Sequence, residues 1–191
     1  MKLIDKILKE NMTEKGFKLW NGVKSILPDI WEKATSSTGK YHKKENGDVP
    51  DIAEHTFEML YAASKIIRMF SIEKNTTMCD TIMLSLVLHD SLKYGKTGDM
   101  KHTYTKHDQL AGDMIKANES TFKKLLNNEE FNILSESARY HSGQWSTDVL
   151  NRSDFNFDNF SPYVLFVHML DMLSTSDLIK IWTKDLKIEE E

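Results

Sequence analysis

The spacing of the apolar residues is the feature that most restricts how this chain can fold. Across residues 17–31, apolar side chains recur three and four positions apart. The same spacing returns in the segments 51–70, 76–90, 105–117, 129–141 and 161–178, and residues 1–9 are also compatible with a short amphipathic helix. This is the period of helices with one buried face, and no segment shows the alternation expected of a strand. The sequence therefore predicts an all-α fold, a single bundle of six to eight helices.

Local signals indicate where several of these helices begin. Thr76 (or Asn75 before it) can cap a helix, and Ser161 followed by Pro162 has the N-cap and first-turn proline typical of a helix start. Thr105 is predicted as another N-cap because Asp108 stands in the capping-box position three residues later. Pro28 is expected to interrupt or end the pattern in 17–31.

The length of 191 residues suits one domain with a small appendage. We expect a helical extension over residues 1–40, packed on the core, and the main domain over 41–191. Residues 34–50 are rich in Ser, Thr, Gly and Lys and are predicted to form a long loop. Trp20 and Trp31 lie at helical spacing, which favours packing of the extension onto the core, with a homodimer contact as the alternative.

Composition excludes several classes of function. The formal net charge of -4 disfavours binding to long nucleic acid. Cys79 is the one cysteine, so no internal disulfide is possible and a reducing compartment such as the cytoplasm is expected. No stretch approaches the ~20 apolar residues of a membrane span, and the charged first ten residues do not resemble a signal peptide.

Polar groups interrupt the predicted core at a few places. In "SLVLHDSLKYG" an imidazole and a carboxylate, His89 and Asp90, close a helix whose preceding residues are apolar. His55 lies between apolar positions of its own helix, and Asp171 is embedded in "FVHMLDML". An isolated carboxylate in apolar surroundings is costly unless it is paired, hydrogen-bonded or bound to a cation. Imidazole with carboxylate suits a divalent ion such as Mn²⁺, Fe²⁺, Co²⁺, Ni²⁺ or Mg²⁺, and the absence of nearby cysteine argues against structural zinc.

Each of these residues also has a simpler interpretation. A buried histidine is more often hydrogen-bonded to a neighbour than bound to metal, and we keep that interpretation for His102 and His168. Asp171 can instead face an arginine, a helix N-terminus or solvent.

The order of the polar residues resembles the H…HD…D signature of the HD-domain metal-dependent phosphohydrolases, extended by two further histidines. "LVLHDSLKYG" resembles the helix-ending "LLHDIGK" of that family and puts Lys93 at the lysine position. "YTKHDQLAGDMI" and "ARYHSGQW" resemble the segments that supply the further histidines, here His107 and His141. "SSTGKYH", ahead of His55, is similar to segments in HD proteins encoded by bacteriophages. The resemblance covers roughly residues 41–177.

This resemblance implies a phosphohydrolase that uses one or two divalent ions. The implied ligands are His55, His89, Asp90 and Asp171 for the first ion, with His107 and His141 added around Asp90 for a second. Asp90 and Lys93 are the implied catalytic residues, and Lys40, His42 and Lys93 are expected to bind the substrate phosphate. The expected substrate is a small phosphorylated molecule, a nucleotide above all, in the cytoplasm (the host cytoplasm if the chain is phage-encoded). Two alternatives remain open: a di-iron HD-type oxygenase, and a non-catalytic interaction protein on the same scaffold.

Overall fold

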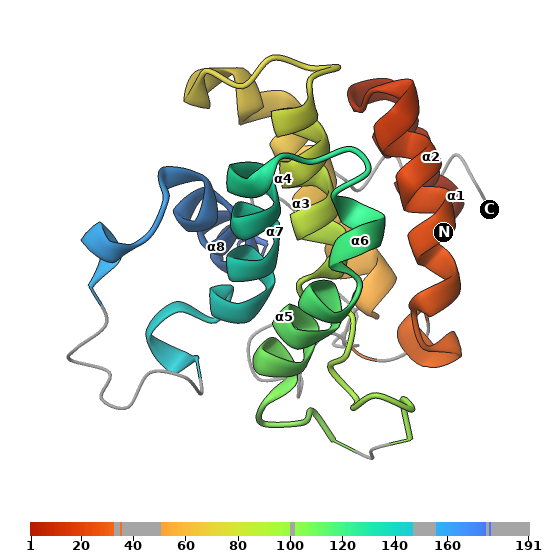
Figure 1. Ribbon diagram of the computed structural model, residues 1–191. Helices are drawn as coiled ribbons and strands as arrows, with labels where there is room; N and C mark the ends of the chain where they lie inside the picture. Colours follow the sequence, from red (N-terminus) through yellow and green to blue (C-terminus); the bar gives the residue numbers. More distant parts are fainter. Residues whose placement is uncertain (33–34, 36–50, 100–101, 147–155, 175, 177–191) are drawn as a thin grey trace.

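The computed structural model describes residues 1–32, 35, 51–99, 102–146, 156–174 and 176. Within this part of the chain there are eight α-helices and no β-strand, which confirms the predicted all-α bundle (Figure 1). The helices are α1 (Lys2–Asn11), α2 (Glu14–Val23), α3 (Ile52–Ile66), α4 (Thr77–Leu88), α5 (His107–Ala117), α6 (Glu119–Phe122), α7 (Asn128–Tyr140) and α8 (Pro162–Leu173). Short 3-10 turns follow several of them: η1 (Lys24–Ile26), η2 (Asp29–Glu32), η3 (Ile67–Phe70), η4 (Gly143–Trp145) and η6 (Phe157–Asn159).

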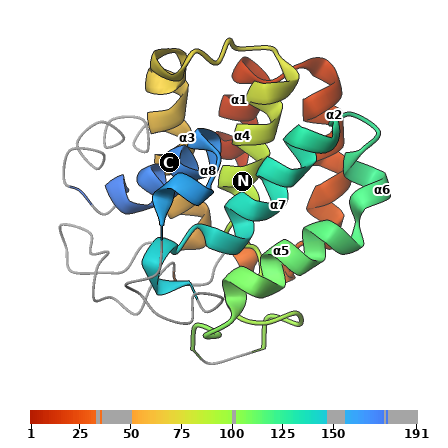
Figure 2. The same ribbon diagram turned by 60° about the vertical axis from the view of Figure 1, so that its left-hand side comes forward.

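Helix α4 lies at the centre of the bundle. Every residue from Cys79 to Leu88 is buried, because α1, α2, α3, α7 and α8 all pack against this helix (Figures 1 and 2). A helix that is apolar around its whole circumference must be enclosed in this way. Its C-terminal end therefore delivers the next two residues, His89 and Asp90, into the interior rather than to the surface.

Helices α5 and α7 pack closely against each other and meet at one end of the bundle. Gly112 permits this approach, since a Cβ added there would lie only 2.9 Å from the Cβ of Arg139. The start of α5 lies beside the end of α7, where His107 and His141 face each other. Close packing of these two helices thus positions two of the predicted ligands.

The N-terminal helices lie against the bundle. α1 contacts α3 and α4, and α2 contacts α4. The Asp80 carboxylate of α4 accepts hydrogen bonds from the backbone N–H and the hydroxyl of Thr13, the N-cap of α2, at 2.8 and 2.5 Å. Trp20 and Trp31 are both buried, as their spacing favoured. The expected domain boundary at residue 40 and the loop over 34–50 lie, but for Thr35, outside the described residues.

The predicted helix ends were partly right. The Thr76 hydroxyl accepts from the N–H of Cys79, and the Ser161 hydroxyl accepts from that of Tyr163, so both caps are confirmed. The prediction for Thr105 is wrong: α5 begins at His107, and its N-cap residue, Lys106, makes no side-chain cap hydrogen bond.

The helix predicted from the pattern over residues 17–31 ends before Pro28 is reached. Helix α2 stops at Val23, and two 3-10 turns follow it. Among the described helices, none has the length and apolar character needed to cross a membrane.

Candidate metal centre

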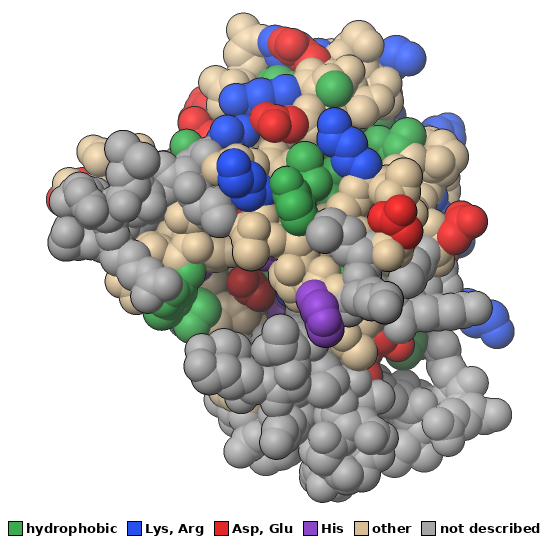
Figure 3. Space-filling model, turned by 90° about the horizontal axis from the view of Figure 1, so that it is seen from below, with side chains coloured by type: hydrophobic (Ala, Val, Ile, Leu, Met, Phe, Trp, Pro, Cys, Tyr) green, Lys and Arg blue, Asp and Glu red, His purple; other side chains and the backbone are tan. Residues whose placement is uncertain are grey.

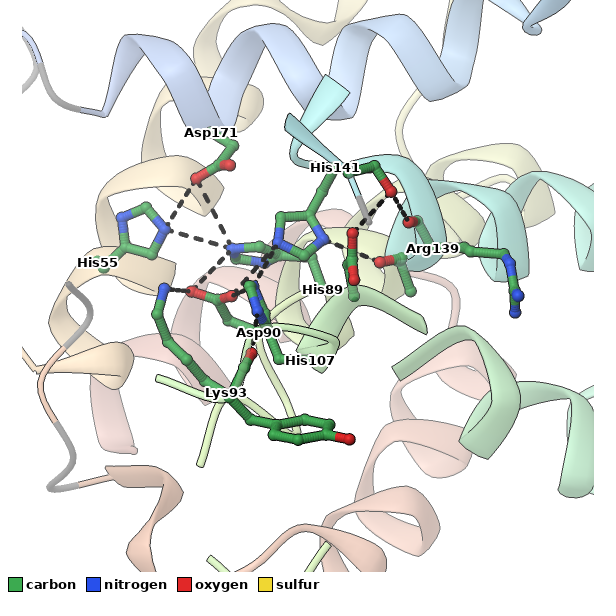
Figure 4. Close-up of polar contacts among 12 residues, drawn as sticks. His55, His89, Asp90, Lys93, His107, Arg139, His141 and Asp171 are labelled. Carbon is green, nitrogen blue, oxygen red and sulfur yellow. Dashed lines mark hydrogen bonds and ion pairs between the residues drawn. The ribbon is translucent and has the colours of Figure 1, made fainter. Parts of the chain in front are cut away.

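Five segments of the chain bring the six predicted ligands to one place inside the bundle (Figure 4). They form two groups of three, each able to hold a metal ion. The first group is His55, His89 and Asp171, and the second is Asp90, His107 and His141. His55 comes from α3 and Asp171 from α8; His89 and Asp90 follow α4; His107 opens α5; His141 follows α7. Within each group the ligand atoms all lie within 4.8 Å of one another.

The first group has its three ligand atoms at short range. His55 Nε2 lies 3.3 Å from His89 Nε2 and 3.2 Å from Asp171 Oδ1. His89 Nε2 lies 3.9 Å from the same Asp171 oxygen. Asp90 adds a fourth atom on this side, because its Oδ2 is 3.6 Å from His89 Nε2.

The second group is more compact. Asp90 Oδ1 lies 3.3 Å from His107 Nε2 and 3.4 Å from His141 Nε2, and the two nitrogens are 3.2 Å apart. Two ligands bonded to one ion at about 2.1 Å lie about 3.0 Å apart at a right angle and about 3.4 Å apart at the tetrahedral angle. The second group falls in this range, and the first needs only a small adjustment. Asp90 turns one oxygen to each group and is therefore placed to bridge two ions.

Backbone carbonyls fix the orientation of three of the histidine rings. The Nδ1 atoms of His89, His107 and His141 lie 2.7, 2.9 and 2.8 Å from the carbonyl oxygens three residues earlier, those of Leu86, Tyr104 and Ala138. A carbonyl only accepts hydrogen bonds, so each Nδ1 carries the proton and donates it. In the neutral ring Nε2 then holds a lone pair, and all three lone pairs point into the centre. This is the arrangement by which metal-binding histidines are held in proteins.

One oxygen of the carboxylate between these rings lacks a matching donor. Asp90 Oδ1 is buried and, within the described part of the chain, receives no well-directed hydrogen bond. Burial by itself raises the pKa of Asp90, but the charge of Lys93 and the neighbouring imidazoles outweigh it and hold that pKa well below its usual value. Acceptor atoms that converge in this way need a proton or a cation between them, and the donor set suits a divalent metal.

Burial and neighbouring charges also oppose each other in setting the pKa values of other titratable groups of the centre. Burial lowers the pKa of His89 to about 4, so this ring is neutral near pH 7. Burial also lowers the pKa of His141, but the adjacent Asp90 carboxylate outweighs burial and raises that pKa. Burial raises the pKa of Asp171, whereas His55 and His89 more than offset it and keep the carboxyl ionised. The centre thus presents ionised carboxylates to a cation, and a metal ion at His141 would compete with a proton for the ring.

Three side chains around the centre are partly exposed, and we call this exposed part its opening. Side chains of Asp171, His107 and Lys93 are 19%, 14% and 12% exposed, whereas His55, His89, Asp90 and His141 are almost fully buried. Lys93 Nζ lies 2.5 Å from Asp90 Oδ2, so a fixed positive charge stands at this opening. From this end of the molecule, histidine and acidic side chains are visible in a recess (Figure 3).

The remaining predicted residues have different outcomes. Lys40 and His42 lie outside the described residues. His102 is exposed, in keeping with a role outside the centre. His168 is half-buried and donates from Nδ1 to the backbone oxygen of His141 at 2.6 Å, so it supports the end of α7 rather than joining either group.

Sequence reasoning missed residues that support the ligands. Ser174 Oγ lies 3.1 Å from His55 Nδ1, although the two residues are 119 positions apart. The Asp108 carboxylate, predicted to help cap α5, is instead buried and accepts from the hydroxyl of Ser146 at 2.6 Å. Only the three-residue spacing from Asp171 to Ser174 was visible beforehand, and that spacing alone carries no specific signal.

Searches against models of protein families, curated proteins and solved structures find no match to this chain. An all-α bundle with buried His and Asp groups able to hold metal is compatible with an HD domain.

Proposed function

We propose that this chain is an HD-type metal-dependent phosphohydrolase that hydrolyses a phosphoester of a nucleotide or a related small phosphorylated molecule. The observation that carries the proposal is the position of Asp90. Its two carboxylate oxygens face two separate His and Asp groups, with Oδ2 toward His89 and Oδ1 toward His107 and His141. A carboxylate placed between two groups of ligands could bridge two ions, and two neighbouring ions can stabilise both the attacking and the leaving oxygen in hydrolysis of a phosphoester.

Divalent ions bound here would lower the pKa of a coordinated water and neutralise charge on phosphoryl oxygens. The chain's own residues would divide the remaining tasks. The histidines hold the centre rigidly, because the Nδ1 atoms of His89, His107 and His141 are hydrogen-bonded to backbone carbonyls. Asp90 is held in place by burial. Lys93 supplies a point charge at the opening, where a phosphate oxygen would arrive.

The substrate class follows from access and charge. The opening is bordered by Asp171, His107 and Lys93, and it lies within a molecule of net charge -4. A small nucleotide brings few charges to such a surface, whereas long nucleic acid would be repelled along its length. Lys40 and His42 remain predicted contacts for the substrate phosphate.

A phosphate-release screen tests this proposal. The purified chain, stripped with chelator and reloaded with Mn²⁺, Co²⁺ or Mg²⁺, is incubated with nucleoside monophosphates, dNTPs, cyclic nucleotides and short oligonucleotides. We expect one of these classes to be hydrolysed only with metal, and elemental analysis to find one or two equivalents. Absence of bound metal and of metal-restored hydrolysis would refute the proposal.

One observation favours a second candidate, a di-iron oxygenase. Each group consists of two histidines and one carboxylate, the set that non-haem iron enzymes use. Loading with Fe²⁺ under anaerobic conditions, followed by addition of oxygen and candidate substrates, separates the two. Substrate-dependent oxygen consumption without phosphate release would favour the oxygenase. Bound metal with neither activity would favour an interaction protein with a structural metal.

A further inference from the structure

One histidine of the centre is held differently from the other three. His89, His107 and His141 each donate to a carbonyl of their own chain segment, three residues earlier. His55 Nδ1 instead meets the hydroxyl of Ser174, at the C-terminal end of α8. Ser174 is buried and its backbone N–H bonds to the carbonyl of Leu170, so the hydroxyl is fixed in place by the helix end.

The hydrogen bonds of this serine determine which nitrogen of His55 carries the proton. Ser174 Oγ lies 2.6 Å from the carbonyl oxygen of Asp171, an atom that only accepts, so the hydroxyl proton is donated there. Toward His55 the same oxygen can then act only as an acceptor. His55 Nδ1 must therefore carry the proton, which leaves a lone pair on Nε2, the atom that lies 3.2 Å from Asp171 Oδ1.

We propose that Ser174 is a positioning residue that holds His55 in its metal-binding tautomer and joins it to Asp171 as one unit across α3 and α8. This proposal rests on the metal-binding part of the proposed function and deepens it. Without the hydroxyl, the opposite tautomer becomes favourable. His55 would then donate from Nε2 to Asp171 Oδ1, and two ligands of the first group would satisfy each other instead of a metal ion.

The test compares three variants. Ser174→Ala removes the hydroxyl, and Ser174→Thr keeps it. Ser85→Ala is the matched control, because Ser85 is also buried and donates to a backbone carbonyl of its own helix, that of Thr81, at 2.8 Å. The tautomer of His55 is read in metal-free protein from the ¹⁵N shifts of its imidazole, assigned with a His55→Gln variant. Mn²⁺ and Co²⁺ binding are measured by equilibrium dialysis.

We expect wild type, Ser174→Thr and Ser85→Ala to show a protonated Nδ1 on His55, and Ser174→Ala to show a protonated Nε2. Binding of one metal equivalent should weaken about 10–100-fold in Ser174→Ala, the usual effect of losing such a supporting contact, while the other is unchanged. A protonated Nδ1 in Ser174→Ala, with binding like that of Ser85→Ala, would overturn the proposal. Since the tautomer is read without metal or substrate, this result does not depend on whether the chain hydrolyses phosphoesters.

Discussion

Asp90 is the residue on which the whole centre depends. It is buried, it follows the most enclosed helix of the bundle, and it is within 3.3–3.6 Å of three histidine nitrogens. Removing either a histidine or Asp171 would disturb one group of ligands, whereas a change at Asp90 disturbs both. The cost of holding this carboxylate ionised in the interior is offset by Lys93 and by the surrounding imidazoles.

The first prediction concerns the substitution Asp90→Asn. The amide keeps the size of the side chain but removes its charge and one acceptor atom, so this residue can no longer serve both groups as an ionised ligand. We expect bound metal to fall below one equivalent, with metal-dependent activity reduced more than 100-fold, the scale on which loss of an essential charged group acts. Elemental analysis and far-UV circular dichroism check this. Wild-type metal content in a folded variant would contradict it.

A second prediction separates charge at the opening from metal binding. Lys93→Met keeps the aliphatic stem but removes the ammonium that lies 2.5 Å from Asp90 Oδ2. We expect metal content to persist and turnover to fall about 100-fold, because one preorganised charge near the reacting phosphate is lost. The control is Lys96→Met, an exposed lysine three residues further on. Equal activity of the two variants would exclude a role for Lys93.

At the scale of single helices, α2 contains two glycines in opposite situations. Gly16 lies against the carboxylate of Asp80, where an added Cβ would overlap the carboxyl group, while nothing lies within 4 Å of a Cβ added at Gly22. The Asp80 carboxylate cannot move away easily, since it is held by Thr13. The same substitution should therefore have opposite effects at the two positions.

The third prediction is that Gly16→Ala destabilises the fold by about 1–3 kcal/mol, the usual cost of overpacking. Gly22→Ala should stabilise it by about 0.5–1 kcal/mol, because alanine has the higher helix propensity. Urea unfolding of both variants measures this. Destabilisation of similar size in both would show that the contact between α2 and α4 does not restrict Gly16.

Much of the secondary structure could be predicted, because helix formation and capping depend on residues close together in sequence. The apolar period located α3, α4, α7 and α8, and the caps at Thr76 and Ser161 depend on residues adjacent in sequence. Thr105 had an equally good local signal and failed, because the Asp108 carboxylate accepts from Ser146 of another segment and from the N–H of Gln109, not from Thr105. Local patterns predict a helix end only where no distant partner competes for the capping group.

The same limit explains what could be predicted of the site. The types and the order of the predicted ligands can be read from the sequence, and the structure brings all six residues together. How these residues divide into two groups, with Asp90 facing both, depends on how the helices pack. Ser174 was not predictable, because its importance comes from a contact with a residue 119 positions away.

For the whole molecule, the ligands join parts of the chain that are distant in sequence. They span positions 55 to 171 and come from or directly follow five helices. The unfolded chain cannot hold these groups together, so an ion that binds only the folded state stabilises the entire bundle. Metal binding and global stability should therefore change together.

The fourth prediction follows from this linkage. Mn²⁺ at about 100 times its dissociation constant should stabilise the fold by about 2.7 kcal/mol. In a chain of 191 residues this corresponds to a rise of roughly 5–10 °C in Tm. Differential scanning fluorimetry with Mn²⁺ or with chelator measures the change, and Asp90→Asn serves as the control that should not respond. An equal rise in that variant would mean that the ion acts elsewhere.

The last prediction concerns acid and the metal-free protein. Burial holds the folded-state pKa of His89 at about 4, below the unfolded value of about 6.5. Between these two values the unfolded chain binds a proton that the folded chain does not, so the free energy of unfolding falls as pH decreases from about 6.5 to about 4. His141 acts in the opposite direction, because its raised pKa gives stability that is present at low pH and lost as pH rises. His89→Gln removes the first contribution and leaves the His141 ring in place. Urea unfolding at pH 7, 6, 5 and 4, with chelator present, should show wild type losing more stability toward pH 4 than this variant, and parallel pH curves would contradict the neutral, buried state of His89.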